Sequence, residues 1–456
     1  MRRCGRTRAA ASSAKRSTRR ARRSRPNRLL AQRLHNDSTI YWFPRQRGLR
    51  IVHPLVRTHR PTGNPAMKRI GSFALLALPV ALHAAGAHAQ SSVTLYGIAD
   101  AGIAYVHNVQ DANGGNASNL VKFSSGNLSG SRWGLRGIED LGSGLSALFQ
   151  LENGFNIGTG ALGQGQREFG RKAVVGLASS TYGTVTFGRQ YDPVVDLVQG
   201  LTEDNYFGGV FATPGDLDNY DNSLRVSNSV KYTSPLISGF QFAALYGFGG
   251  VAGATGSGRT YSFGLSYANG PLSLGAGYFF ANGGSTVANG VRTWSSSSDT
   301  LFNTVINQGF SSAKSIQIVR AAGQYVLGAA TFGLAYSNTQ YGADTLSAFR
   351  QNAKFNNGSA FFNWQFSPAL RAGVGYNYTS LTGPASAHYN QVNVGADYAL
   401  SKRTDLYALF GYQKASGNTL NASGALVKAA ASVGSYGANA GTDTQELAIV
   451  GIRHKF

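Results

Sequence analysis

Seven acidic residues lie between Arg189 and Arg225 with no lysine or arginine among them: Asp192, Asp196, Glu203, Asp204, Asp216, Asp218 and Asp221. Carboxylates gathered in this way can bind a cation, or can face basic side chains and form a charged lining that selects ions. A solvated acidic surface loop would have the same composition. Because Tyr206, Phe207 and Phe211 supply apolar anchors, the stretch is predicted to be ordered and functional.

Other patterns with chemical meaning do not indicate an enzyme. Gly158–Gly163 matches G-x-G-x-x-G but opens no helix, and Asp216–Asp221 lacks the glycine and the later glutamate of a calcium loop. After residue 89 the histidines are His107, His388 and His454, far apart in sequence, so no nucleophile, base and orienting acid come together. We expect no catalytic residue, metal or cofactor.

Residues 1–66 differ from the rest of the chain, since they carry 18 basic residues and one acid. Such composition cannot bury a core. It is compatible with a nucleic-acid-binding arm, a nuclear signal or a transit peptide. The favoured interpretation is that the segment is not part of the protein, because translation begins at Met67. Nucleic acid is therefore not an expected partner.

Residues 67–89 have the pattern of a secretory signal peptide. Lys68 and Arg69 form the basic start, residues 70–82 contain a short apolar run, and Ala87-His88-Ala89 provides a small-x-small cleavage site. Cleavage between Ala89 and Gln90 would leave residues 90–456 as the folded part. A signal preceded by 66 further residues would function poorly, which supports the start at Met67.

The predicted mature part is nearly balanced in charge and has no cysteine. Of the 42 basic residues, 18 lie in 1–66 and two in 67–89, which leaves 22 against 19 acids and a net charge of about +3. The single cysteine of the chain is Cys4. An exported protein without disulfides must obtain its stability from the backbone and its packing.

From Gln90 onward the sequence breaks into short runs in which apolar and polar residues alternate, as in half-buried strands. Tyr261–Tyr267 and Leu406–Tyr412 are clear cases. The pattern predicts 16 strands, over residues 92–107, 130–139, 144–157, 168–179, 182–190, 225–234, 239–249, 259–268, 271–280, 314–327, 329–340, 356–367, 369–380, 388–400, 403–415 and 445–456.

The connections alternate between tight turns and long loops such as 281–313 and 416–444. An even strand number with this alternation is typical of a closed barrel in a bacterial outer membrane, where hydrocarbon cannot satisfy an open sheet edge. A soluble sandwich or solenoid is the alternative. The export signal and the 22 Tyr and 25 Phe, often at strand ends, favour a 16-stranded antiparallel transmembrane β-barrel.

Five stretches, in order along the chain, resemble the general porins of Gram-negative bacteria, most closely the trimeric porins of β-proteobacteria. They are Ser92–Gly97, Ser131–Gly137 with Glu139–Gly142, Tyr182–Tyr191, Asn228–Pro235 and Val450–Phe456. The resemblance implies a homotrimer of barrels in the outer membrane. Each barrel would hold its third loop, here residues 189–225, in a water-filled pore.

The resemblance also implies opposed charges at the narrowest point of the pore. The basic wall would be Arg132, Arg171 and Arg225, and the acidic loop would contribute Asp192, Asp196, Glu203 and Asp204. Where related porins carry Pro-Glu-Phe-Gly-Gly, this chain reads Asn205-Tyr-Phe-Gly-Gly209. The glutamate at the loop tip is absent, which leaves the acid at the narrowest point undecided.

At the C-terminus, Val450, Ile452 and Phe456 share one face of the last predicted strand. In the family that it resembles, this pattern is the signal read by the outer-membrane assembly machinery. Outer-membrane lipid and lipopolysaccharide, and small hydrophilic solutes and ions, are the other implied partners.

Three functions remain open on the sequence: a general diffusion channel, a channel selective for one solute class such as anions, sugars or amino acids, and a non-conducting barrel that serves as an adhesin. The absent tip glutamate and the slight positive charge favour anions over cations.

Overall fold

A computed structural model describes residues 92–456, apart from residues 112–114, 116, 285, 289 and 295–301. The segments 1–66 and 67–89, with the predicted cleavage between Ala89 and Gln90, lie outside the described residues. They stay predictions.

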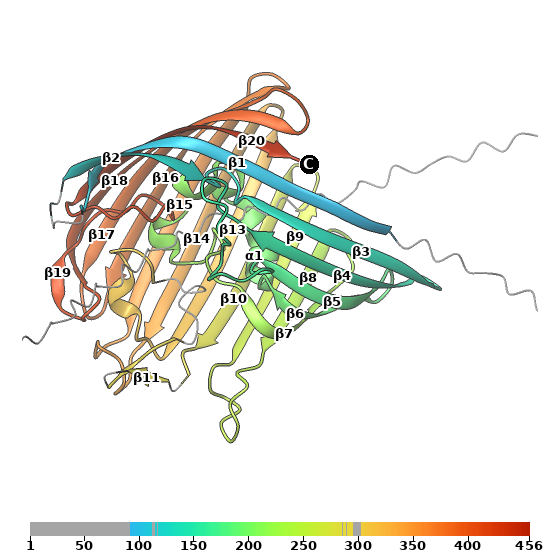
Figure 1. The fold of residues 1–456 in the computed structure, drawn as a ribbon, viewed down its shortest axis with the longest axis horizontal. Coiled ribbons are helices and arrows are strands. Elements are labelled where there is room, and N and C mark those ends of the chain that lie inside the picture. Colours follow the sequence, from blue (N-terminus) through green and yellow to red (C-terminus); the bar gives the residue numbers. More distant parts are fainter. Residues whose placement is uncertain (1–91, 112–114, 116, 285, 289, 295–301) are drawn as a thin grey trace, which may run out of the picture. The chain divides into compact units, whose positions relative to one another are not determined.

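Sixteen strands of the described residues form a closed antiparallel barrel (Figure 1), which confirms the predicted fold class. Four further strands, β2 (Ser118–Ser125), β11 (Val287–Ala288), β12 (Val291–Arg292) and β19 (Leu426–Lys428), lie outside the ring of sixteen. The barrel strands are β1 (Ser92–Val109), β3 (Arg132–Gly142), β4 (Leu145–Gly154), β5 (Lys172–Ser179), β6 (Gly183–Gln190), β7 (Val226–Thr233), β8 (Phe240–Gly247), β9 (Thr260–Asn269), β10 (Leu272–Asn282), β13 (Ser315–Leu327), β14 (Ala330–Gly342), β15 (Ala353–Gln365), β16 (Leu370–Thr382), β17 (Ala387–Ala399), β18 (Thr404–Leu420) and β20 (Thr444–Lys455).

The barrel closes because the first strand pairs with the last. β1 pairs with β20 from Ile98↔Lys455 to His107↔Glu446. On its other edge β1 pairs first with β3 and then, from Ala101↔Ser125 onward, with β2. Closure joins the two end strands of the sheet, which is the condition for a sheet that spans hydrocarbon.

Alternation of side chains along the strands separates an apolar outside from a polar inside. On β16, Val374, Tyr376 and Tyr378 point outward and are exposed, whereas Asn377 and Thr379 point inward and are buried. The same period of two runs through the other long strands. Among the described residues, no helix has the length and apolar character needed to span a membrane.

The segment between β6 and β7 has secondary structure of its own, which the sequence analysis did not predict. It contains the helices α1 (Pro193–Val198) and α2 (Asp204–Phe207) and three-ten turns at Gln199–Leu201, Gly208–Val210 and Pro214–Asp216. Each is too short to produce a recognisable apolar period. The Asp192 cap and Pro193 at the first helical position start α1 instead.

The segment 189–225 shares the barrel interior with two other long loops. Residues 429–440 and 302–313 also bury apolar side chains against inward-facing residues. One buried cluster joins Phe207, Val210 and Phe211 to Val433 and Tyr436. Another contains Val194, Leu217, Ile306 and Phe310. Three long loops therefore pack against one another inside the barrel.

Candidate functional site

Asp192, the first predicted loop acid, is a structural cap for α1. Its Oδ1 accepts a hydrogen bond from the Val194 backbone N–H at 2.8 Å, and its Oδ2 accepts one from the Asn219 amide at 3.2 Å. Ser262 on the inner face of β9 donates to the same carboxylate at 3.3 Å. Asp192 thus ties the start of the loop both to its end and to the barrel wall.

Asp196 forms an ion pair with Lys231 of β7, and both side chains are largely buried. The same ammonium donates to the Tyr191 carbonyl at 2.9 Å. The sequence analysis did not single out Lys231, although its position opposite Val230 and Tyr232 in an alternating strand places it on the polar, inward face. This loop acid therefore meets a basic residue that lies outside the predicted wall.

Glu203 and Asp204 lie at the start of α2. Glu203 contacts the inner face of β16, where a Cβ at Gly375 would collide with its carboxylate. Burial, and then the neighbouring Asp204, raise the pKa of Glu203 well above its ordinary value. Burial raises the pKa of Asp204 to about 7, although hydrogen bonds from Thr202 and Gln199 partly offset the effect.

Two of the three predicted wall arginines lie together. The Arg171 Nε is 2.7 Å from the Glu152 carboxylate, and the Arg132 Nη1 is 4.0 Å from the same oxygen. Arg225 is connected to this pair through Tyr191: its guanidinium lies 5.4 Å from the centre of the Tyr191 ring, and the Tyr191 side chain is hydrogen-bonded to Arg171. Burial lowers the pKa of Arg171 to about 10, so the side chain stays charged at neutral pH.

The acid that the structure brings toward this wall is Asp221, which attracts the Arg171 guanidinium. The four acids predicted to face the arginines are distributed over other partners. Glu152 of β4 is a second carboxylate at the wall, and it also accepts a hydrogen bond from Tyr96 at 2.7 Å. Sequence reasoning noted Asp221 as one of seven loop acids and did not mark Glu152.

Arg320 of β13 is a further basic residue of the wall that contacts the loop, and sequence reasoning missed it. Its guanidinium lies 3.4 Å from the centre of the Tyr220 ring, and it donates to the Asn219 carbonyl at 3.1 Å. Its charge also attracts the carboxylates of Asp192, Asp204 and Asp218. The sequence contained one signal for this role. Arg320 falls on the same face of β13 as inward-facing apolar residues, and a lone arginine among them requires partners.

Val450, Ile452 and Phe456 all face outward and are exposed. The Phe456 backbone pairs with Gly97 through two hydrogen bonds of 3.0 Å, just beyond the end of β20. The Phe456 ring covers Gly97, where a Cβ would collide with it. The residues of the predicted assembly signal therefore lie beside the seam between the first and last strands.

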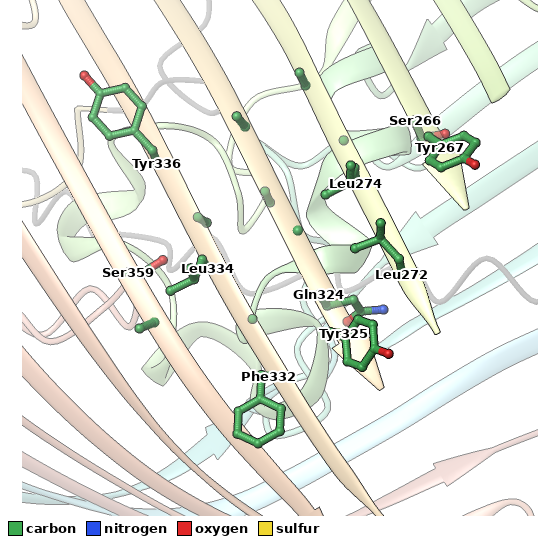
Figure 2. Close-up of a pocket in the computed structure, with 18 of the residues that line it drawn as sticks. Ser266, Tyr267, Leu272, Leu274, Gln324, Tyr325, Phe332, Leu334, Tyr336 and Ser359 are labelled. Atoms are coloured by element: carbon green, nitrogen blue, oxygen red, sulfur yellow. The ribbon is translucent and has the colours of Figure 1, made fainter. Parts of the chain in front are cut away.

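A groove of about 1130 Å³ lies on the outer surface over β8–β10 and β13–β16, not in the lumen. Leu274, Leu334 and Tyr336 line it with their exposed side chains (Figure 2), and small residues such as Ala276 and Ala321 also line it. An apolar depression on this face is part of the surface that meets lipid.

A closed barrel that is apolar outside and lined inside by ion pairs and buried polar groups defines a membrane channel of the bacterial outer-membrane type. The chain belongs to the Gram-negative porin family, whose model matches residues 74–418. It is 32% identical over 388 residues to an outer membrane porin protein of Bordetella pertussis, covering 75% of this chain and 93% of that protein. It is 36% identical over 214 residues to outer membrane porin protein 32 of Delftia acidovorans, covering 44% and 58%.

Solved structures agree with this assignment. An anion-selective porin from Comamonas acidovorans matches with a TM-score of 0.60 and 25% identity, covering 80% of this chain and all of that one. OmpT of Vibrio cholerae, solved in a trimer form, shares the fold at 18% identity with a TM-score of 0.56. The protein is therefore an outer-membrane porin, a water-filled channel for passive diffusion of small hydrophilic solutes and ions. These relatives are channels, not enzymes.

Proposed function

We propose that the porin prefers anions and that Arg132, Arg171 and Arg225 supply the positive potential. The observation that supports this proposal is that the loop acids and the wall arginines differ in how far they are ionised at neutral pH. Burial and the nearby Asp218 raise the pKa of Asp216 to about 7, as burial does for Asp204, and burial also raises the pKa of Glu203. Asp204 and Asp216 are therefore partly neutral at physiological pH, whereas arginines stay charged. The Comamonas porin, described as anion-selective, is consistent with this preference.

In this proposal the acids on the loop side of the constriction are Asp192, Asp196, Glu203 and Asp204. Asp192 and Asp196 hold the loop through a cap and an ion pair. Glu203 and Asp204 contribute charge that depends on pH. Sugars and amino acids remain solutes that such a channel would also admit, at rates set by size.

The test is the reversal potential in a planar bilayer with a KCl gradient, which should have the sign of anion preference. Replacing Arg132, Arg171 and Arg225 together with alanine should shift the potential toward cations and raise the conductance, because charge and volume leave the lumen. The same three positions changed to lysine should keep the preference. Lys402→Ala with Arg403→Ala, at an exposed turn, is the control. An alanine triple variant with unchanged potential would disprove the wall assignment.

The anion preference should strengthen as pH falls from about 8 to about 5.5, since Asp204 and Asp216 have pKa values of about 7 and gain protons over this interval. Their pKa values are raised in the fold, so the neutral form is favoured there and the loop loses stability as pH rises through about 7. The reversal potential measured against pH checks this. Asp204→Asn with Asp216→Asn should flatten the curve; a wild-type curve that is already flat would contradict the prediction.

We also propose that the native assembly is a homotrimer in contact with outer-membrane lipid and lipopolysaccharide, and that the assembly machinery recognises Val450, Ile452 and Phe456. Strands β5, β6, β7 and β8 have eight residues each. A lipid-facing strand needs about 9–11 residues, so a neighbouring protomer that covers this arc would relieve the mismatch. The mass of the detergent-solubilised protein by light scattering tests this; a monomer alone would contradict it.

A further inference from the structure

Three inward-facing glutamines lie side by side on adjacent strands. Gln391 of β17 is the register partner of Gln413 of β18, and Gln413 is the register partner of Gln445 of β20. All three are buried, with at most 1% of their surface exposed. A glutamine in a water-filled lumen would be solvated, so a buried row of three, which we name the glutamine ladder, requires other partners.

The backbone of residues 429–440 provides these partners. Gln413 accepts a hydrogen bond from the Ser432 N–H at 2.8 Å and donates to the Ser432 carbonyl at 2.8 Å. Gln445 accepts from the Val433 N–H at 2.9 Å and donates to the Ala438 carbonyl at 2.9 Å. Gln391 accepts from the Gly434 N–H at 2.8 Å. The ladder therefore holds the loop between β18 and β20 inside the barrel.

Gln391 also binds the loop between β6 and β7, residues 191–225, which we call the 191–225 loop. Its amide nitrogen lies 3.1 Å from the Val210 carbonyl and 3.2 Å from the Ala212 carbonyl, and donates to both. The two loops contact each other directly as well. The Gly215 N–H donates to the Gly434 carbonyl at 2.8 Å, and the Ser435 N–H donates to the Gly209 carbonyl at 2.9 Å. The Ser435 hydroxyl donates to the Asp221 carboxylate.

Apolar packing completes the docking of the segment. Val433 and Tyr436 join the buried cluster that contains Phe207 and Val210. The Tyr436 hydroxyl donates to Ser124 at 2.9 Å, on the β2 side of the barrel. The segment thus reaches from the ladder on β17, β18 and β20 to β2 and packs against the loop between β6 and β7.

We propose that residues 429–440 are a second pore-narrowing loop, docked by the glutamine ladder and coupled to the 191–225 loop through Gln391. The two loops together set the largest solute that passes. Gln391, Gln413 and Gln445 are positioning residues: they act on permeation through the loop that they hold.

The first experiment replaces the ladder with leucine, as Gln391→Leu, Gln413→Leu and Gln445→Leu together. Leucine has similar volume but cannot bind the loop backbone, so the segment should leave the lumen. Single-channel conductance should rise by about twofold, and liposome swelling should admit larger sugars. Gln317→Leu with Gln340→Leu is the matched control, because this outward-facing pair sits on adjacent strands at the same end of the barrel. It should leave both readouts unchanged.

The second experiment restores the docking by a covalent link. Since residues 90–456 contain no cysteine, Asp221→Cys and Ser435→Cys add the two thiols that a short reducible cross-linker joins. Added to the leucine ladder variant, the link should return the conductance to that of the same cysteine pair in a chain with the ladder intact, and reduction should raise it again. A variant that merely folds poorly would not recover in this reversible manner.

Two results would overturn the proposal. One is an unchanged conductance and size limit in the assembled leucine variant. The other is a conductance of that variant that does not respond to the link. If the leucine variant fails to assemble, residues 430–439 are replaced by a short Gly-Ser linker with the ladder intact. This variant should show the same increase, and a wild-type conductance there would equally disprove the role.

Discussion

Phe456→Ala is expected to reduce the yield of assembled barrel in the outer membrane by about tenfold while synthesis and export of the chain continue. The Phe456 ring covers Gly97 of the first strand, and the two backbones exchange hydrogen bonds of 3.0 Å at the seam. Without the ring the seam is open to lipid at its end, and unsatisfied backbone groups in hydrocarbon cost several kcal/mol each. Phe456 is also the last residue of the proposed assembly signal.

The measurement is the fraction of heat-modifiable protein in outer-membrane preparations. Phe366→Ala is the matched control, because Phe366 is another exposed aromatic residue at a short turn and lies away from the seam. Equal losses in the two variants would assign the effect to aromatic residues at the membrane interface in general, and would contradict a special role of the terminus.

Arg320→Ala should release the 191–225 loop from the wall. The change removes the cation that attracts Asp192, Asp204 and Asp218 and the contact with the Tyr220 ring. Removal of one partner from a buried charge cluster costs roughly 3–5 kcal/mol. The expected result is a higher and noisier single-channel conductance, together with proteolytic cleavage between Arg189 and Arg225.

Arg320→Lys should restore part of the wild-type behaviour, since it keeps the charge and loses the planar stacking on Tyr220. Arg350→Ala, at an exposed position, should behave as the wild type does. A wild-type conductance and proteolysis pattern in Arg320→Ala would show that the loop is held without this residue.

The barrel could be predicted because a spanning sheet enforces a period of two. The strand expected over residues 259–268 is β9 at Thr260–Asn269, and the one expected over 403–415 is the start of β18. The order of short turns and long loops could also be read from the sequence. β2 was missed because the prediction treated all residues between the strands 92–107 and 130–139 as a connection. In the structure, residues from Ser118 to Ser125 of that connection pair with β1.

The inside of the barrel was less predictable, since contacts there join residues far apart in sequence. The arginines Arg132 and Arg171 could be named, but not their common partner Glu152, which is merely one polar residue in an alternating strand. Residues 429–440 have the small and polar composition of a solvated loop. Their burial depends on hydrogen bonds to glutamines on three strands, and no local pattern reports such bonds.

The way in which the ladder binds its loop has a consequence for how the surface of this porin can change in evolution. Gln413 and Gln445 contact backbone atoms of Ser432, Val433 and Ala438, not their side chains. A substitution other than proline at these three positions keeps the backbone atoms that form these bonds, whereas an insertion between residues 432 and 438 shifts their spacing. The neighbouring exposed hairpin around Leu426–Lys428 lies outside that constraint. It can diverge under selection by antibodies or bacteriophages while the permeability of the channel is conserved.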